Sequence, residues 1–169
     1  MKQELAIRDR QDIIPVQEGE KVSLVTLMVG PQLFGIPILK IQDILIPDAI
    51  YPVPLSPFQV AGSINQRGRV VTLIDARKRL GIRAPKSKQN NKKVCVIFMH
   101  ESEIYGILVD KVGDVMELDK SLFENTPHTL KPEWKEVCVG VYRTEQALLL
   151  ELDMEKFVKL EPGGDEIRN

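Results

Sequence analysis

Short apolar runs rich in β-branched residues, broken by Gly, Pro and Asn, dominate the pattern of hydrophobic and polar positions along this chain. Runs of this kind are typical of buried strands. We predict strands at 22–29, 70–74, 94–99, 104–109 and 147–152. The 11 prolines argue against long helices. Short helices are predicted at 38–46, 76–80 and 153–160, the last with Asp153 as its N-cap.

Polar segments divide the chain around these runs. Residues 1–20 lack periodicity and are predicted to form a flexible N-terminal arm, and residues 161–169 are predicted to form a C-terminal tail. The basic, turn-rich stretch 82–93 is predicted to connect two lobes of a single domain at 21–160. Lobe one would cover about 21–81 and lobe two about 94–160.

An internal repeat relates the two lobes. Phe34–Ile44 aligns with Tyr105–Val115 at an offset of 71 residues, and farther along, at an offset of 78 residues, Asp75 aligns with Asp153. A half of this size would bury only a marginal core on its own, and closing short strands into barrels removes exposed edges. We therefore predict a mainly β protein of two similar small barrels. The repeat leaves open whether the barrels exchange strands.

Charge adds one asymmetry to this picture. The chain has 23 Lys+Arg and 24 Asp+Glu, so its net charge of -1 gives no whole-molecule attraction to nucleic acid or to an anionic membrane. Residues 67–93, however, contain ten basic residues and one acid, which gives this segment +9 and the remainder -10. The segment is either a solvated connector or an oriented contact surface for a partner.

Patterns for catalysis and metal binding are missing from the sequence. His100 and His128 stand in no HxH, HExxH or CxxC context and are expected at the surface. Cys95 and Cys138 lie in apolar runs and are expected to be buried thiols. We predict that the protein is not an enzyme and needs no metal or cofactor. Direct membrane insertion is not expected, because the longest apolar run, Val94–Met99, is too short to span a bilayer.

Nucleic-acid binding through the basic segment 67–93 is the alternative function, because small barrels often bind single strands. Such binding relies on aromatic side chains interleaved with basic ones, and no Phe, Trp or Tyr lies between Phe58 and Phe98. We therefore expect no nucleic-acid partner and place a protein partner first.

One candidate protein-binding segment is residues 36–46. It holds more isoleucine and leucine than a short helix can easily bury, and the surplus would leave an apolar groove for an amphipathic helix. We predict Ile36, Ile38 and Ile41 near the edge of this groove. The alternative is that all of these side chains belong to the core.

A second candidate is the stretch Asn65-Gln66-Arg67-Gly68-Arg69, which is predicted to be a hairpin tip between two strands. We predict that Arg67, flanked by Asn65 and Gly68, anchors a partner there, because an arginine on a rigid turn beside apolar strands is a common interface anchor. A solvated turn is the alternative.

Three motifs of the sequence resemble CheW-like domains. Residues 60–75 (VAGSINQRGRVVTLID) resemble the signature Gly-Val-x-Asn-Leu-Arg-Gly-x-Val-x-Pro-Val-x-Asp-Leu of that family. Residues 34–44 are similar to its YGIDILKVQEI segment, and residues 105–112 are similar to its G-[IL]-x-VD-x-V segment. The similarity covers about residues 20–160, so the chain resembles a stand-alone domain of the family.

The resemblance implies a fold and a function. The fold would be two intertwined SH3-like five-stranded β-barrels with a few short helices around a shared apolar core. The function would be that of a non-enzymatic adaptor in chemotaxis signal transduction, which couples the cytoplasmic helical tips of chemoreceptors to the regulatory domain of a CheA-type histidine kinase. Such a protein would be cytoplasmic and recruited to membrane receptor arrays.

The resemblance also assigns roles to single residues. The functional arginine of the family falls on Arg67, its receptor contacts fall on Ile41 and Asp43, and Gly62 matches the glycine that opens the signature. The sequence departs from the family at three positions, where Leu, Pro and Leu are usual: Gln66, Thr72 and Ala76. These departures bear on the partner contact more than on the fold.

Overall fold

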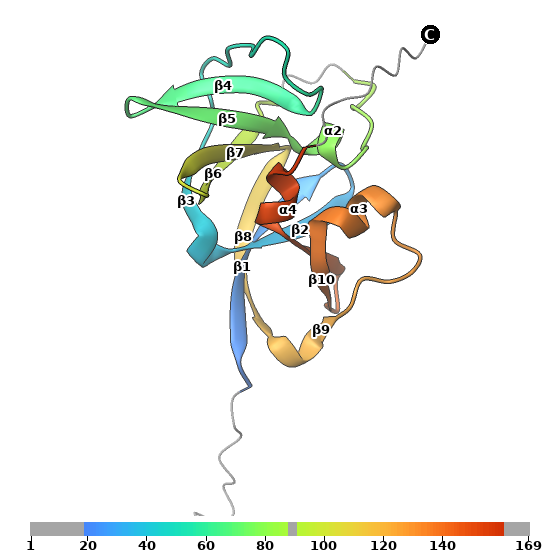
Figure 1. Ribbon diagram of the computed structural model, residues 1–169. Helices are drawn as coiled ribbons and strands as arrows, with labels where there is room; N and C mark the ends of the chain where they lie inside the picture. Colours follow the sequence, from blue (N-terminus) through green and yellow to red (C-terminus); the bar gives the residue numbers. More distant parts are fainter. Residues whose placement is uncertain (1–18, 88–90, 161–169) are drawn as a thin grey trace, which may run out of the picture.

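The computed structural model describes residues 19–87 and 91–160; most of the predicted arm and all of the predicted tail lie outside these residues. Strands make up most of the described chain, with short helical turns between them (Figure 1). In chain order the elements are β1 (Lys21–Val29), β2 (Gln32–Pro37), η1 (Ile38–Lys40), β3 (Ile41–Leu45), β4 (Val60–Gln66), β5 (Arg69–Asp75), α2 (Ala76–Arg79), β6 (Val94–His100), β7 (Glu103–Val109), β8 (Lys111–Asp119), η2 (Lys120–Leu122), β9 (Phe123–Glu124), α3 (Pro132–Val137), β10 (Cys138–Arg143), β11 (Leu148–Leu152) and α4 (Met154–Val158).

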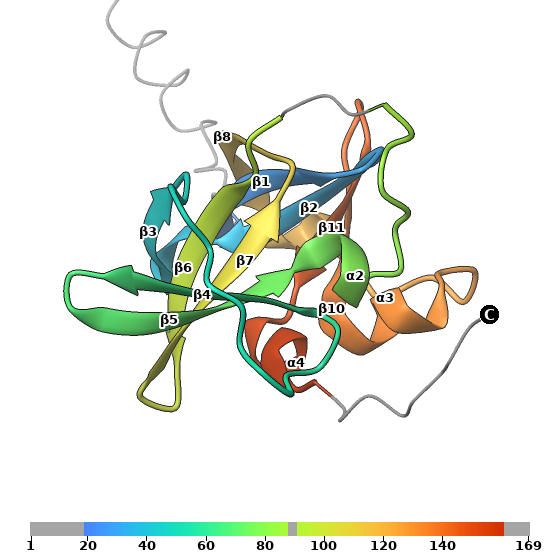
Figure 2. The ribbon, with the colours of Figure 1, turned by 90° about the horizontal axis from the view of Figure 1, so that it is seen from above.

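The strands form two sheets, and each sheet takes strands from both halves of the sequence (Figures 1 and 2). The five-stranded barrel has the order β3-β6-β7-β5-β4, and the six-stranded barrel has the order β8-β1-β2-β11-β10-β9. Strand β3 of the first half pairs with β6 of the second, and β8 of the second half pairs with β1 of the first. The lobes predicted at 21–81 and 94–160 therefore correspond to the two copies of the sequence repeat, and neither lobe forms a sheet by itself.

The predicted mainly β fold of two intertwined barrels is confirmed. The sheet of the six-stranded barrel contains one strand more than expected, because the two-residue strand β9 adds to β10. Two parallel pairings, of β11 with β2 and of β5 with β7, join the halves within each sheet.

Each barrel encloses a small apolar cluster, and a larger shared core lies between the barrels. Strand β6 contributes side chains to a barrel cluster and to the shared core. Cys95 and Ile97 point into the five-stranded barrel, and Val96 and Phe98 point into the shared core. Successive side chains of a strand point to opposite faces, so a strand buried on both faces reads as one unbroken apolar run. The cluster inside the six-stranded barrel consists of Leu24, Leu118, Tyr142 and Leu149.

Two of the predicted helices are confirmed, and both follow the aspartates that match in the repeat. The Asp75 carboxylate accepts a hydrogen bond from the backbone N–H of Arg77 at 2.9 Å, at the start of α2. The Asp153 carboxylate accepts one from the N–H of Glu155 at 3.1 Å, at the start of α4. Both are N-caps, which satisfy N–H groups that have no partner within the helix.

The helix predicted at 38–46 is wrong. Residues 38–40 form the single turn η1, and residues 41–45 form the edge strand β3, which pairs with β6. Burial alternates between half-buried and exposed from Ile41 to Leu45, which is the period of a strand. An apolar run of this length fits either period, and the pairing partner supplied by the distant β6 decides between them.

None of the helices formed by residues 19–87 and 91–160 is long and apolar enough to cross a membrane.

Candidate functional site

The β4–β5 hairpin carries the predicted arginine at its tip. Strand β4 ends at Gln66 and β5 begins at Arg69, so Arg67 and Gly68 form a two-residue turn, with φ angles of 51° and 80°. This backbone twist suits a tight hairpin, and glycine adopts it without steric cost. The Asn65 side-chain carbonyl accepts a hydrogen bond from the N–H of Gly68 at 3.0 Å. The predicted hairpin tip is confirmed.

A polar contact joins this hairpin to β3. The Gln66 side-chain amide donates a hydrogen bond to the Asp43 carboxylate at 2.6 Å, and the second carboxylate oxygen accepts the N–H of Ile44 at 2.8 Å. Strands β3 and β4 are the two edges of the five-stranded sheet, so the contact bridges its edges. Arg67 stands 3.9 Å from Asp43, and its side chain is 86% exposed. The guanidinium is accessible to a partner, because it is exposed and its contact with Asp43 is longer than that of Gln66.

Gln66 has a role that sequence reasoning missed. Its side-chain carbonyl oxygen is buried and has no hydrogen-bond partner among the described residues. A buried acceptor without a partner costs stability. Glutamine in place of the usual leucine therefore adds a hydrogen bond to Asp43 and buries a carbonyl oxygen at a cost in stability.

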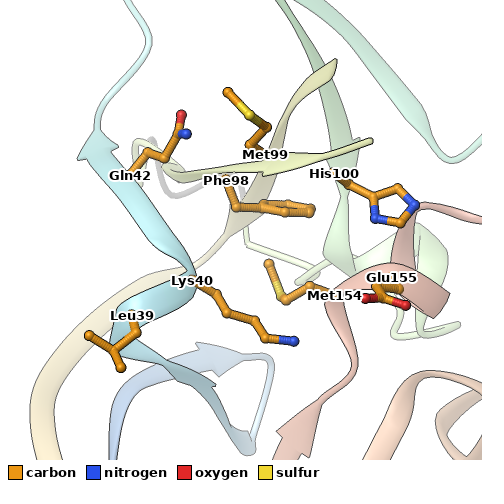
Figure 3. Close-up of a pocket in the computed structure, with 8 residues that line it drawn as sticks. All are labelled: Leu39, Lys40, Gln42, Phe98, Met99, His100, Met154 and Glu155. Atoms are coloured by element: carbon orange, nitrogen blue, oxygen red, sulfur yellow. The ribbon is translucent and has the colours of Figure 1, made fainter. Parts of the chain in front are cut away.

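A depression lies between the two barrels, with a volume of about 310 Å³. Figure 3 shows Phe98 and Met154 near its centre and His100 and Glu155 on one side. The lining comes from η1 and β3 (Leu39, Lys40, Gln42), from β6 (Phe98, Met99, His100) and from α4 (Met154, Glu155). We call this site the inter-barrel depression. Its apolar centre and charged rim suit an apolar side chain of a polar-flanked partner segment.

The three isoleucines predicted at the groove edge differ in how exposed they are. Ile36 is fully buried in the shared core, so we remove it from the partner surface. Ile41 is half-buried against the same core and pairs with Phe98. Ile38 is 41% exposed. Among the apolar side chains of residues 36–46, that of Leu39 is the most exposed, at 97%. Of the three isoleucines, only Ile36 is excluded from the surface, and Leu39, which the sequence did not single out, is exposed.

Gly62 is buried on β4, against the backbone of Tyr51. Its φ is +146°, and a Cβ there would meet the carbonyl oxygen of Tyr51 at 2.4 Å. The close approach lets Tyr51 and Ser63 exchange two backbone hydrogen bonds, at 2.9 and 2.7 Å. Only glycine fits such a contact at this backbone angle. Gly62 is thus a structural position, and we remove it from the predicted contact residues.

The segment between β3 and β4 forms a second apolar surface that sequence reasoning did not single out. Residues 46–58 contain six large apolar side chains that are exposed: Ile46, Ile50, Tyr51, Val53, Leu55 and Phe58. Leu55 adopts a positive φ of 59°, which is uncommon for leucine and aims a fully exposed side chain at solvent. Exposed apolar groups in this number make the segment a candidate contact surface. We call it the 46–58 loop.

Some cations of the basic segment 67–93 are paired within the protein. Arg77 binds Asp110 through a contact of 2.6 Å, and the hydrogen bond to Asp110 raises the pKa of Arg77. Burial acts to raise the pKa of Asp110, but hydrogen bonds from Arg77 and from the Gly30 N–H outweigh it and lower that pKa. Lys93 binds Asp75 at 2.5 Å. These internal ion pairs leave Arg77 and Lys93 less available to a nucleic acid.

The residues that could carry chemistry are scattered or inert. Both cysteines are buried as predicted, and burial raises the pKa of each thiol to about 12. His128 is exposed as predicted, whereas His100 is half-buried in the inter-barrel depression. Within the part of the chain that the structure describes, no three His, Cys, Asp or Glu side chains are grouped to hold a metal ion.

Two intertwined barrels with strands exchanged between the halves of the sequence define a class of paired-barrel proteins. The chain belongs to the CheW-like domain family, whose model matches residues 23–161. It is 27% identical to the chemotaxis protein CheW of Treponema pallidum, over 81% of this chain and 82% of that protein. It is 30% identical to the chemotaxis protein CheW of Rhizobium meliloti, over 77% of this chain and 84% of that protein.

A solved structure has the same fold. The scaffolding protein TtCheW from Thermoanaerobacter tengcongensis superposes with a TM-score of 0.74 at 21% sequence identity, over 85% of this chain and 97% of that one.

Proposed function

We propose that this protein is a non-enzymatic adaptor in chemotaxis signal transduction, which binds the cytoplasmic helical tip of a chemoreceptor and the regulatory domain of a CheA-type histidine kinase. Membership of the CheW-like family supports this proposal. The observation that carries it is the inter-barrel depression, which is lined by β3 and β6 of the five-stranded barrel and by η1 and α4, the helical turns that follow β2 and β11 of the six-stranded barrel. The adaptor would work in the cytoplasm and reach the receptor arrays through its receptor contact.

On the receptor side, the depression suits an amphipathic helix. Phe98 and Met154 supply an apolar floor, and the exposed Leu39 supplies an apolar lip. Strand β3 connects this site to the hairpin, because Gln42 lines the depression and the next residue, Asp43, contacts the hairpin. A helix seated in the depression would place an acidic side chain within reach of Arg67.

On the kinase side, we assign the 46–58 loop. It runs beside the edge strand β4 of the five-stranded barrel, to which Tyr51 is bridged, and its exposed apolar side chains suit the apolar face of another small barrel. One rigid body would then touch both partners. A receptor conformation that changes its contact with the depression would shift the balance of kinase states by its differential binding free energy.

Calorimetric titration with a receptor-tip fragment tests the receptor contact. Leu39→Asp should weaken binding roughly 30-fold, as expected for a central apolar anchor, and Arg67→Glu about tenfold. Val139→Asp is the matched control, because Val139 is an exposed apolar residue on the six-stranded barrel outside the depression. Unchanged affinity of both test variants, or an equal loss in the control, would overturn the assignment.

A further inference from the structure

Helix α4 connects the inter-barrel depression to the other barrel. Its first turn contributes Met154 and Glu155 to the depression. The backbone carbonyls at its opposite end, of Lys156, Phe157 and Lys159, all accept hydrogen bonds from one side chain, that of Arg79. Helix α4 follows β11 of the six-stranded barrel, whereas Arg79 ends α2, which follows β5 of the five-stranded barrel.

The contacts of Arg79 use most of its guanidinium. Nε donates to the Phe157 carbonyl at 3.1 Å, and Nη2 donates to the carbonyls of Lys156 at 3.1 Å and Lys159 at 3.3 Å. Nη1 lies 3.7 Å from the Glu136 carboxylate of α3, and the Arg79 side chain is only 11% exposed. The last carbonyls of a helix lack partners within it, and a fixed fork of N–H donors can satisfy several at once.

A helix as short as α4 depends on such external contacts. Five residues are too few for a helix to be stable by itself. Its start is fixed by the Asp153 cap and by burial of Met154 and Phe157 in the shared core. At its end, Arg79 binds the last carbonyls.

We propose that Arg79 is a positioning residue of the inter-barrel depression, which fixes α4 against the five-stranded barrel and so sets the shape of the depression without lining it. The effect on the free protein is independent of any partner. The predicted effect on receptor binding rests on the proposed function.

The neighbouring Lys78 provides a matched control. It lies in the same short helix α2 and its side chain is exposed. Replacing it removes the same charge from the same helix but leaves the α4 carbonyls capped. Arg79→Lys is the conservative variant, because it retains the charge but not the fork of donors.

Methionine methyl NMR of the free protein tests the positioning directly. Met99 and Met154 line the depression, and Met28 and Met116 lie on strands outside it and serve as internal references. In Arg79→Ala the methyl resonances of Met99 and Met154 should shift while the references stay in place. Arg79→Lys should shift them by an intermediate amount, and Lys78→Ala should shift neither.

Receptor-tip binding is then measured on the same variants. Arg79→Ala should weaken it by about 2- to 30-fold, the range seen for residues that act on a site without touching the ligand. Resonances of Met99 and Met154 that stay in place in both Arg79 variants overturn the positioning role, and so does affinity that stays at the wild-type value although they shift. If Arg79→Ala does not fold, Arg79→Lys decides both points. Failure of the wild-type protein to bind overturns the proposed function and leaves the NMR test standing.

Discussion

Asp110 holds three segments together, and its removal should destabilise the fold by a predictable amount. Its carboxylate accepts hydrogen bonds from two nitrogens of Arg77, Nε at 2.9 and 3.1 Å and Nη2 at 2.6 Å, and from the Gly30 N–H at 2.7 Å. These bonds tie the end of β7 to α2 and to the β1–β2 turn. The side chains of Arg77 and Asp110 are 15% and 27% exposed.

Breaking a fully buried ion pair by removing one partner costs about 3–5 kcal/mol. Because this pair keeps some contact with water, we expect Asp110→Ala to cost about 2–3 kcal/mol. For a chain of this size that corresponds to roughly 5–10 °C in melting temperature. Urea unfolding followed by circular dichroism measures it, with Asp114→Ala as control, because Asp114 is exposed on the adjacent strand β8.

The same contact predicts a dependence on pH. The pKa of Asp110 is lower in the folded protein than its ordinary value, because the hydrogen bonds from Arg77 and Gly30 outweigh burial. A carboxyl of this kind stabilises the folded state above its unfolded pKa of about 3.9, and the contribution is lost as the pH falls through the folded pKa. The difference between wild type and Asp110→Ala should therefore be full at neutral pH and shrink below about pH 4. A variant as stable as the wild type at pH 7, or a difference that grows in acid, would refute this reasoning.

Three further predictions follow from burial and backbone geometry. Ile36→Ala should cost about 2–5 kcal/mol in urea unfolding with no selective loss of receptor binding, whereas Ile38→Ala should cost under about 1 kcal/mol; equal costs would contradict their placement. Gly62→Ala should lose at least about 2 kcal/mol through strain and collision, and Gly68→Ala about 1 kcal/mol through strain alone, since its surroundings are open; the reverse order in melting temperature would be a contradiction. Gln66→Leu should be neutral or stabilising by about 1 kcal/mol, because it removes a buried acceptor that has no partner in the described structure; clear destabilisation would show that the bridge to β3 dominates.

The fold could be predicted from the sequence because its signals are local and repeated. Strand runs, the glycine-containing repeat and the capping residues Asp75 and Asp153 each depend on a few neighbouring residues, and all are found as expected. The prediction of a helix at 38–46 is wrong because the apolar pattern fits the period of a helix and that of a strand. Only pairing with β6 selects the strand.

The candidate site could be predicted only in part. The turn of the Arg67 hairpin can be predicted from its own residues. The inter-barrel depression brings together Leu39, Phe98 and Met154, which are far apart in the sequence. No local sequence pattern predicts that these three residues lie close together. Which isoleucine faces outward also depends on register, since the pairing of Ile36 with Val25 of β1 fixes its side chain in the core.

In the proposed function, one chain binds two partners at once through separate surfaces. Analytical ultracentrifugation of the protein with a receptor-tip fragment and a kinase regulatory domain tests it most directly. We predict a complex of all three, from which Leu39→Asp removes only the receptor fragment and Leu55→Asp removes only the kinase domain. Competition between the two partners for the same chain, or the loss of both from a single variant, would contradict the claim.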